Sequence, residues 1–135
     1  MTESNKVNAM CWNCEGIMAG MPYLLKCLDT YDIDICGLSE HWVREYQLSF
    51  FNSFNHSGYK CFVKPVYEVD PFRYKCSIRG GVCLLYKSLL NVQEIIIDSP
   101  RIVGLELQSA SGEYSYWFSV YMPASSRPFE IFQEH

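Results

Sequence analysis

The segment from Ile33 to Leu38 constrains the fold more than any other part of the chain. It is an almost uninterrupted apolar run of strand length, which is typical of a strand buried on both faces of a sheet. Upstream, Val7 to Trp12 alternates in the pattern of a first strand. Between them, Pro22 to Leu28 carries leucines at helical spacing. This spacing predicts a short helix with Pro22 in its first turn, where a missing N–H costs nothing. The chain therefore opens as strand, helix, strand.

The rest of the chain consists mainly of further predicted strands, separated by Ser, Gly, Asn, Asp and Pro. One helical connection followed by consecutive strands predicts an α/β fold with a mixed sheet rather than a doubly wound parallel one. Ser111-Gly112 predicts a hairpin turn. Residues 42–55 suit a helix or a loop, and residues 65–78 a loop. The predicted strands are Tyr59 to Val63, Gly81 to Tyr86, Val92 to Ile97, Ile102 to Leu107 and Tyr114 to Tyr121.

The composition argues against several classes of protein. At 135 residues, with 49% apolar and 19% charged residues, the chain suits one folded domain and not a disordered segment. No apolar stretch approaches the ~18 residues needed to cross a bilayer, so we expect no membrane partner. The seven cysteines are odd in number and lack the spacing of a disulfide scaffold. They indicate a reducing intracellular compartment, without distinguishing nucleus from cytoplasm.

The overall charge gives no sign of a nucleic-acid-binding surface. The formal net charge is −4, whereas a positive field is the usual electrostatic signature of such proteins. A site that holds divalent cations with carboxylates could still receive a phosphate, because the bound metal supplies the positive charge.

Polar side chains follow the first two predicted strands at the points where these strands end. Asn13 and Glu15 lie in Cys-Trp-Asn-Cys-Glu-Gly, and Glu40 lies in Leu-Ser-Glu-His-Trp. Because a right-handed crossover leaves the ends of two parallel strands at one edge of the sheet, we expect these side chains to converge there. Carbonyl and carboxylate oxygens are the ligands that Mg²⁺ prefers. Taken alone, the pattern is also compatible with solvated turns.

Four motifs occur along the chain in a distinctive order. They are Trp-Asn-x-(Asp/Glu)-Gly after the first strand, an apolar strand ending in Glu40, Arg-Gly-Gly-Val-x-Leu over residues 79–84, and an aromatic strand that leads to Tyr121 and Pro123. In this order and at about these spacings, they resemble the endonuclease/exonuclease/phosphatase superfamily. The sequence is most similar to the apurinic-type endonuclease domains of LINE-like non-LTR retrotransposons. The resemblance covers nearly the whole chain.

The resemblance implies a fold and a set of residue roles. The implied fold is a four-layer α/β sandwich with two packed mixed sheets, and the implied activity is Mg²⁺-dependent phosphodiester cleavage, with Mn²⁺ as an alternative and DNA as the partner of the intact domain. Glu40 corresponds to the principal metal carboxylate, and Asn13 to the residue that orients the nucleophile or supports the metal. Tyr121 corresponds to the tyrosine that hydrogen-bonds the scissile phosphate. Glu15 is a weaker candidate for a second metal position.

The resemblance also implies motifs that this sequence does not contain. The family uses an Asp-x-Asn and a later Ser-Asp-His, in which the histidine is polarised by the aspartate. Neither occurs here, and His135 follows Glu134. We therefore expect residues 1–135 to form a partial domain whose C-terminal half is missing. Such a chain should be inactive alone and could self-associate through exposed sheet surface.

Other interpretations remain open at this stage. Cys11 and Cys14 form a Cys-x-x-Cys, which could be a dithiol redox site or half of a zinc site. Alternatively, the chain could be a noncatalytic binding or remnant domain. We expect His41 and His56 to be surface or half-buried histidines rather than ligands.

Overall fold

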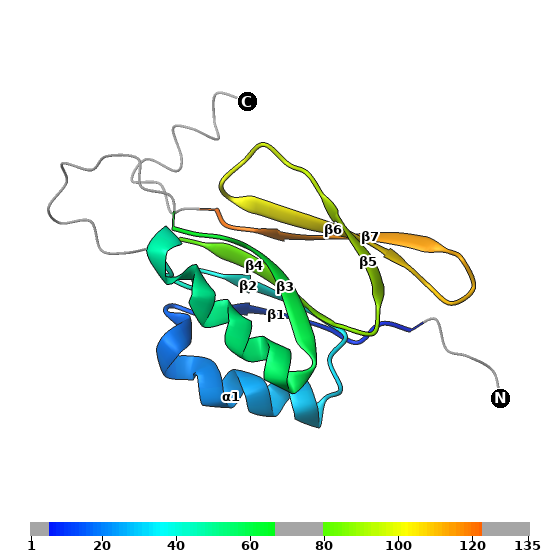
Figure 1. Cartoon of the computed structure of the whole chain (residues 1–135), viewed down its shortest axis with the longest axis horizontal. Coiled ribbons are helices and arrows are strands. Elements are labelled where there is room, and N and C mark those ends of the chain that lie inside the picture. The colour runs from blue at the N-terminus through cyan, green and yellow to red at the C-terminus, as the bar shows by residue number, and fades with distance from the viewer. Residues whose placement is uncertain (1–5, 67–79, 123–135) are drawn as a thin grey trace, which may run out of the picture.

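The computed structural model describes residues 6–66 and 80–122, which form two helices and two sheets (Figure 1). The first sheet has the strand order β1-β2-β4-β3, and the second has the order β5-β6-β7. In chain order the elements are β1 (Ala9–Asn13), α1 (Ile17–Thr30), β2 (Ile35–Ser39), the 3₁₀ helix η1 (Glu45–Ser57), β3 (Tyr59–Lys64), β4 (Val82–Lys87), β5 (Asn91–Ile95), β6 (Ile102–Gln108) and β7 (Tyr114–Val120).

The first sheet is mixed, as predicted. β1 pairs with β2 in parallel, whereas β4 pairs with β2 and β3 in antiparallel fashion. Both helices cover one face of this sheet, and the antiparallel second sheet packs on the other face (Figure 1). The central strand β4 is therefore buried along nearly its whole length. The α/β class with two packed sheets, expected from the sequence, is confirmed.

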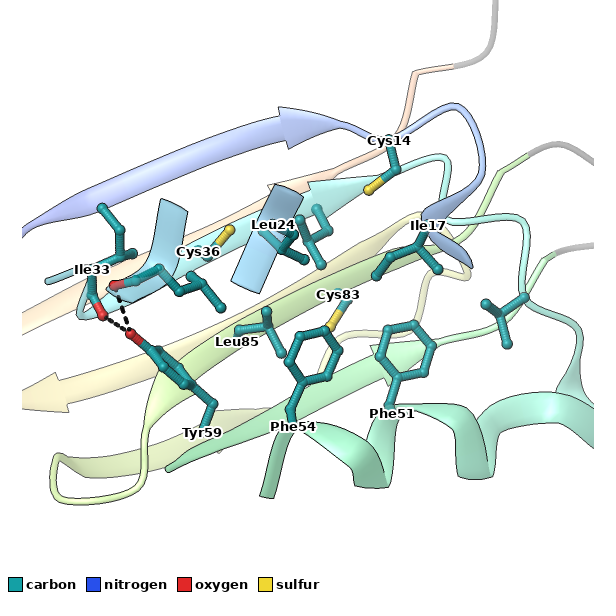
Figure 2. Close-up of a cluster of buried hydrophobic side chains, with 13 residues drawn as sticks. Cys14, Ile17, Leu24, Ile33, Cys36, Phe51, Phe54, Tyr59, Cys83 and Leu85 are labelled. Atoms are coloured by element: carbon teal, nitrogen blue, oxygen red, sulfur yellow. Dashed lines mark hydrogen bonds between the residues drawn. The ribbon is translucent and has the colours of Figure 1, made fainter. Parts of the chain in front are cut away.

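Two apolar clusters fill the spaces between these layers. Between the helices and the first sheet, Leu24 of α1 and Phe54 of η1 face Cys36 and Leu85 of the strands (Figure 2). Between the two sheets, the cluster includes Leu84 of β4 together with Val103 and Leu105 of β6.

In the described part of the chain no helix covers the outer face of the second sheet. Three aromatic side chains of β7 are more than half exposed on that face: Tyr114, Tyr116 and Phe118.

The ends of the predicted strands differ from the observed ones by no more than two residues. The predicted hairpin turn is confirmed, since β6 and β7 pair in antiparallel fashion and Gly112 has a φ of +88°. In the segment for which helix and loop remained open, residues 42–55, the 3₁₀ helix η1 begins at Glu45, and it continues to Ser57. Most of the predicted loop 65–78 lies outside the described residues. No helix of the described residues is long and apolar enough to cross a bilayer.

The prediction for the first helix was wrong at its start. α1 begins at Ile17, so Pro22 lies inside the helix and not in its first turn. A proline at such a position removes one hydrogen bond from the helix. The earlier start is fixed by tertiary contacts, because the Ile17 side chain is fully buried and its N–H donates to the carbonyl of His41 at 3.1 Å. Local sequence spacing does not reveal such a contact.

Candidate active site at the ends of β1 and β2

Asn13 and Glu40 meet at the carboxyl ends of the two parallel strands. The register pairs Asn13 with Ser39, so β1 and β2 end side by side. The Asn13 side chain donates a hydrogen bond from Nδ2 to Oε2 of Glu40 at 2.6 Å. The convergence expected from the strand–helix–strand order is therefore present for the side chains of Asn13 and Glu40.

Backbone hydrogen bonds hold the turn that carries Glu40 from two sides. On one side, the N–H groups of Cys14 and Gly16 donate to the carbonyls of Ser39 and Glu40 at 2.8 and 2.9 Å. On the other side, Glu40 N–H donates to the carbonyl of Gly81 at 2.8 Å, and Trp42 N–H donates to that of Gly80 at 3.1 Å. The Glu40 turn is thus fixed between the segment after β1 and the segment before β4.

Backbone strain is concentrated at the same place. Glu15, Glu40 and Trp42 have φ values of +45°, +55° and +63°. Non-glycine residues rarely adopt this left-handed region, and such strained residues tend to cluster at functional sites. Here the strain turns the chain sharply directly after each strand, which brings the polar side chains to the rim of the sheet.

His41 lies beneath this rim and is almost completely buried, with 1% of its surface exposed. Its Nδ1 accepts a hydrogen bond from Val43 N–H at 2.9 Å, so the ring proton is on Nε2, which donates to the carbonyl of Lys64 at 2.8 Å. Burial lowers the pKa of the imidazole from 6.5 to about 4. The expectation that His41 is surface or half-buried was wrong, because backbone groups satisfy both of its nitrogens, one from the adjacent Val43 and one from the distant Lys64. His56 is exposed.

Three glycines with positive φ each face an aromatic ring around the site. A Cβ atom on Gly81 would lie 2.2 Å from Cε1 of His41, and a Cβ on Gly16 would lie 2.7 Å from the Trp42 ring. Gly80 faces the ring of Tyr121, with 3.4 Å between its hypothetical Cβ and Cε2 of the tyrosine. The Gly80-Gly81 pair therefore has a structural role, while Arg79 lies outside the described residues.

Tyr121 follows β7 and reaches the site from the second sheet. Its ring is half-buried against Gly80, whose carbonyl accepts the hydrogen bond from Trp42 N–H. The tyrosine therefore lies next to the segment that holds the Glu40 turn. Pro123 of the same motif lies outside the described residues.

Glu15 contacts Asn13 through its backbone, since its N–H donates to Oδ1 of Asn13 at 3.3 Å. Its side chain is exposed. Among the residues that the structure describes, no group of three or more His, Cys, Asp or Glu residues gathers in a way that could enclose a metal ion. Any metal held by these residues would therefore be bound through one or two carboxylates.

The two cysteines of the Cys-x-x-Cys motif lie in different environments. Cys11 is exposed and Cys14 is buried, and both are free thiols. Desolvation raises the pKa of Cys14 to about 12, whereas a redox dithiol needs an accessible thiolate of lowered pKa. This environment argues against a redox function.

No family model matches the sequence, and no curated protein matches it either. Solved structures do match the fold. The AP endonuclease LMAP from Leishmania major superimposes with a TM-score of 0.66 at 13% identity, over 91% of this chain and 42% of that protein. The endonuclease domain of TRAS1, a telomere-specific non-LTR retrotransposon, gives a TM-score of 0.63 at 13% identity, over 95% of this chain and 51% of that domain.

A third match is the 3′ phosphatase NExo from Neisseria, solved with a product DNA hairpin. Its TM-score is 0.61 at 15% identity, over 93% of this chain and 47% of that protein. The fold expected from the sequence motifs is therefore confirmed as that of these nucleases and phosphatases. The chain spans about half the length of the solved structures that it matches.

Proposed function

We propose that this chain carries part of the active site of a metal-dependent phosphodiesterase that acts on DNA. The observation that supports the proposal most directly is the 2.6 Å hydrogen bond between Asn13 and Glu40 at the ends of two parallel strands. In a fold shared with nucleases, this bond holds a carboxylate at the rim of the sheet. Glu40 is then the principal metal ligand, and Asn13 orients both this carboxylate and the attacking nucleophile.

The chemistry of these side chains fits Mg²⁺. Mg²⁺ takes oxygen ligands and is often held by one or two carboxylates together with water and substrate phosphates. Asn13 engages Oε2 of Glu40, and no described residue hydrogen-bonds Oε1. Oε1 is thus the oxygen that we assign to the metal, and the exposed Glu15 is a second, weaker candidate. When bound, the cation would neutralise charge on the phosphate oxygens. Mn²⁺ accepts the same kind of oxygen ligands.

Tyr121 is the candidate for direct contact with the phosphate. Its phenol group is a hydrogen-bond donor, and its ring lies against Gly80 beside the Glu40 turn. A donor directed at the developing negative charge of a phosphoryl transition state stabilises that state. We therefore propose that Tyr121 would hydrogen-bond the scissile phosphate while Glu40 would hold the metal.

The sequence supplies no candidate for the nucleophile-activating base. It has no Asp-x-Asn and no Ser-Asp-His, and His41 is buried with both ring nitrogens engaged. General-base catalysis is typically worth ~10² to 10⁴ in rate. We therefore propose that these 135 residues bind the metal but do not cleave DNA alone. The free cysteines of the described residues suit a reducing intracellular compartment.

The proposal is tested by measuring Mn²⁺ binding from the EPR signal of the free ion and nicking of a supercoiled plasmid. We expect Glu40→Gln to abolish Mn²⁺ binding, because it removes the charge and keeps the volume. The control Glu113→Gln changes an exposed glutamate in the β6–β7 hairpin and should bind Mn²⁺ like the parent. Equal Mn²⁺ binding by Glu40→Gln and the parent would refute the metal assignment. EDTA-sensitive nicking by the parent would show that a base has been missed.

A second candidate function, binding without catalysis, is favoured by the outer face of the second sheet. Tyr116 and Phe118 are 58% and 53% exposed on this face. Exposed apolar patches often mark interaction sites, and we propose self-association through this face. Tyr116→Lys places a cation opposite Glu106 in the β6–β7 register and should yield monomers in analytical ultracentrifugation. A parent chain that is already monomeric at every concentration would contradict this candidate.

A further inference from the structure

His41 is a buried polar side chain directly after Glu40 that the proposed chemistry does not use. It lies between two left-handed residues, Glu40 and Trp42, with φ values of +55° and +63°. Its Nδ1 accepts the Val43 N–H at 2.9 Å, and this bond closes the turn directly after Glu40. Its Nε2 donates to the carbonyl of Lys64 at the end of β3. The ring therefore ties the turn that carries Glu40 to a strand on the far side of the sheet.

An apolar side chain could not replace these two contacts. With leucine at position 41, the Val43 N–H and the Lys64 carbonyl would each lose the partner that the ring provides, and an unsatisfied buried polar group is costly. The ring also packs edge-on against Phe51 of η1, with 5.1 Å between centroids. His41 thus combines the packing of a core residue with hydrogen bonds that define the backbone path of the turn.

Gly81 fixes the other side of the ring. A Cβ on Gly81 would lie within 2.5 Å of both ring nitrogens, so the imidazole occupies the space that a side chain would need. The carbonyl of the same glycine accepts the Glu40 N–H at 2.8 Å. Gly81 therefore holds the backbone of Glu40 and the ring of His41 at the same time, which couples the ring position to the position of the carboxylate.

We infer that His41 is a positioning residue that directs the Glu40 carboxylate toward Asn13 through the hydrogen bond with which its ring closes the turn at Val43. The effect of this positioning on metal binding rests on the proposed function. The inference itself concerns the bond from Asn13 Nδ2 to Glu40 Oε2, which exists without metal and can be observed directly by NMR. Outer residues that orient a metal ligand typically change metal affinity by 10- to 100-fold when they are replaced.

The test compares four variants by the NMR signals of the Asn13 side-chain amide. Glu40→Ala defines the signal of an unbonded Asn13. His41→Leu removes both hydrogen bonds and should shift the Asn13 signal to that unbonded position. His41→Asn can still accept the Val43 N–H through a short side-chain carbonyl and should keep the parent signal. Leu28→Ala, a core change in α1, should destabilise the chain without altering the Asn13 signal.

An unchanged Asn13 signal in folded His41→Leu would overturn the inference. If His41→Leu does not fold, His41→Gln replaces it, because the longer side chain reaches toward the Lys64 carbonyl but does not close the turn at Val43. We then expect the Asn variant to keep the bonded Asn13 signal and the Gln variant to lose it. Equal signals in the two variants, or the reverse order, would refute the inference.

Mn²⁺ affinity separates this inference from the proposed function. We expect His41→Leu to weaken Mn²⁺ binding about tenfold and His41→Asn to bind like the parent. If the parent binds no Mn²⁺ while the Asn13 signal still follows His41, the proposed function fails and the positioning role stands. If Mn²⁺ binding depends on Glu40 but not on His41, the positioning role fails and the proposed function stands.

Discussion

Replacement of Gly81 by alanine tests the packing beneath the site with a single methyl group. Two costs add at this position. A non-glycine residue with positive φ costs roughly 1–2 kcal/mol, and Gly81 has a φ of +92°. The new Cβ would also lie 2.2 Å from Cε1 of His41. The ring must then move and leave a buried hydrogen-bond partner unsatisfied, which costs about 1–3 kcal/mol. We expect a total loss of roughly 2–5 kcal/mol in the free energy of unfolding.

Gly58 provides a matched control for the backbone cost. Its φ is +81°, and a Cβ there would meet nothing within 4 Å. Gly58→Ala should therefore lose only about 1–2 kcal/mol. Urea unfolding of both variants, followed by tryptophan fluorescence, gives the two losses. The additional loss of unfolding free energy in Gly81→Ala measures the clash with His41. This additional loss should disappear in a background that carries His41→Ala. Equal losses in the two glycine variants would refute the account of His41 packing.

Three further predictions follow from buried groups. Burial lowers the pKa of His41 from 6.5 to about 4. The folded chain should therefore lose about 3 kcal/mol in the free energy of unfolding as the pH falls from above 6.5 toward 4. Urea midpoints should show this loss in the parent and not in His41→Asn. Cys11 should react quickly with a thiol reagent and Cys14 only on unfolding, and equal rates would contradict the burial of Cys14. Tyr59→Phe removes the hydrogen bond to the Ile33 carbonyl at 2.5 Å. This change should lower the free energy of unfolding by about 1 kcal/mol. An unchanged urea midpoint would show that this bond contributes nothing to stability.

The sequence predicted those parts of the fold that depend on local pattern. Alternating and continuous apolar runs located every described strand, because side-chain period and burial determine a strand directly. The start of α1 was missed, since Ile17 is held by a hydrogen bond to His41, which is distant in sequence. Pro22, the strongest local signal in that region, indicated a helix start about one turn too late.

The candidate site could be predicted only in part for the same reason. The meeting of Asn13 and Glu40 follows from two parallel strands that end at one edge, which a strand–helix–strand pattern implies. The burial of His41 depends on Lys64, 23 residues away, and on the missing side chain of Gly81. No spacing rule connects these positions, so the histidine was expected at or near the surface.

The close fit of His41 against Gly81 places an unequal constraint on the evolution of the two positions. A side chain at position 81 is incompatible with the imidazole, so a lineage that keeps histidine at 41 must also keep glycine at 81. The reverse does not hold, because the positive φ of Gly81 favours glycine whatever residue faces it. Among related sequences, His41 should therefore be replaced while Gly81 is still present. Gly81 should be replaced only where His41 has already been lost.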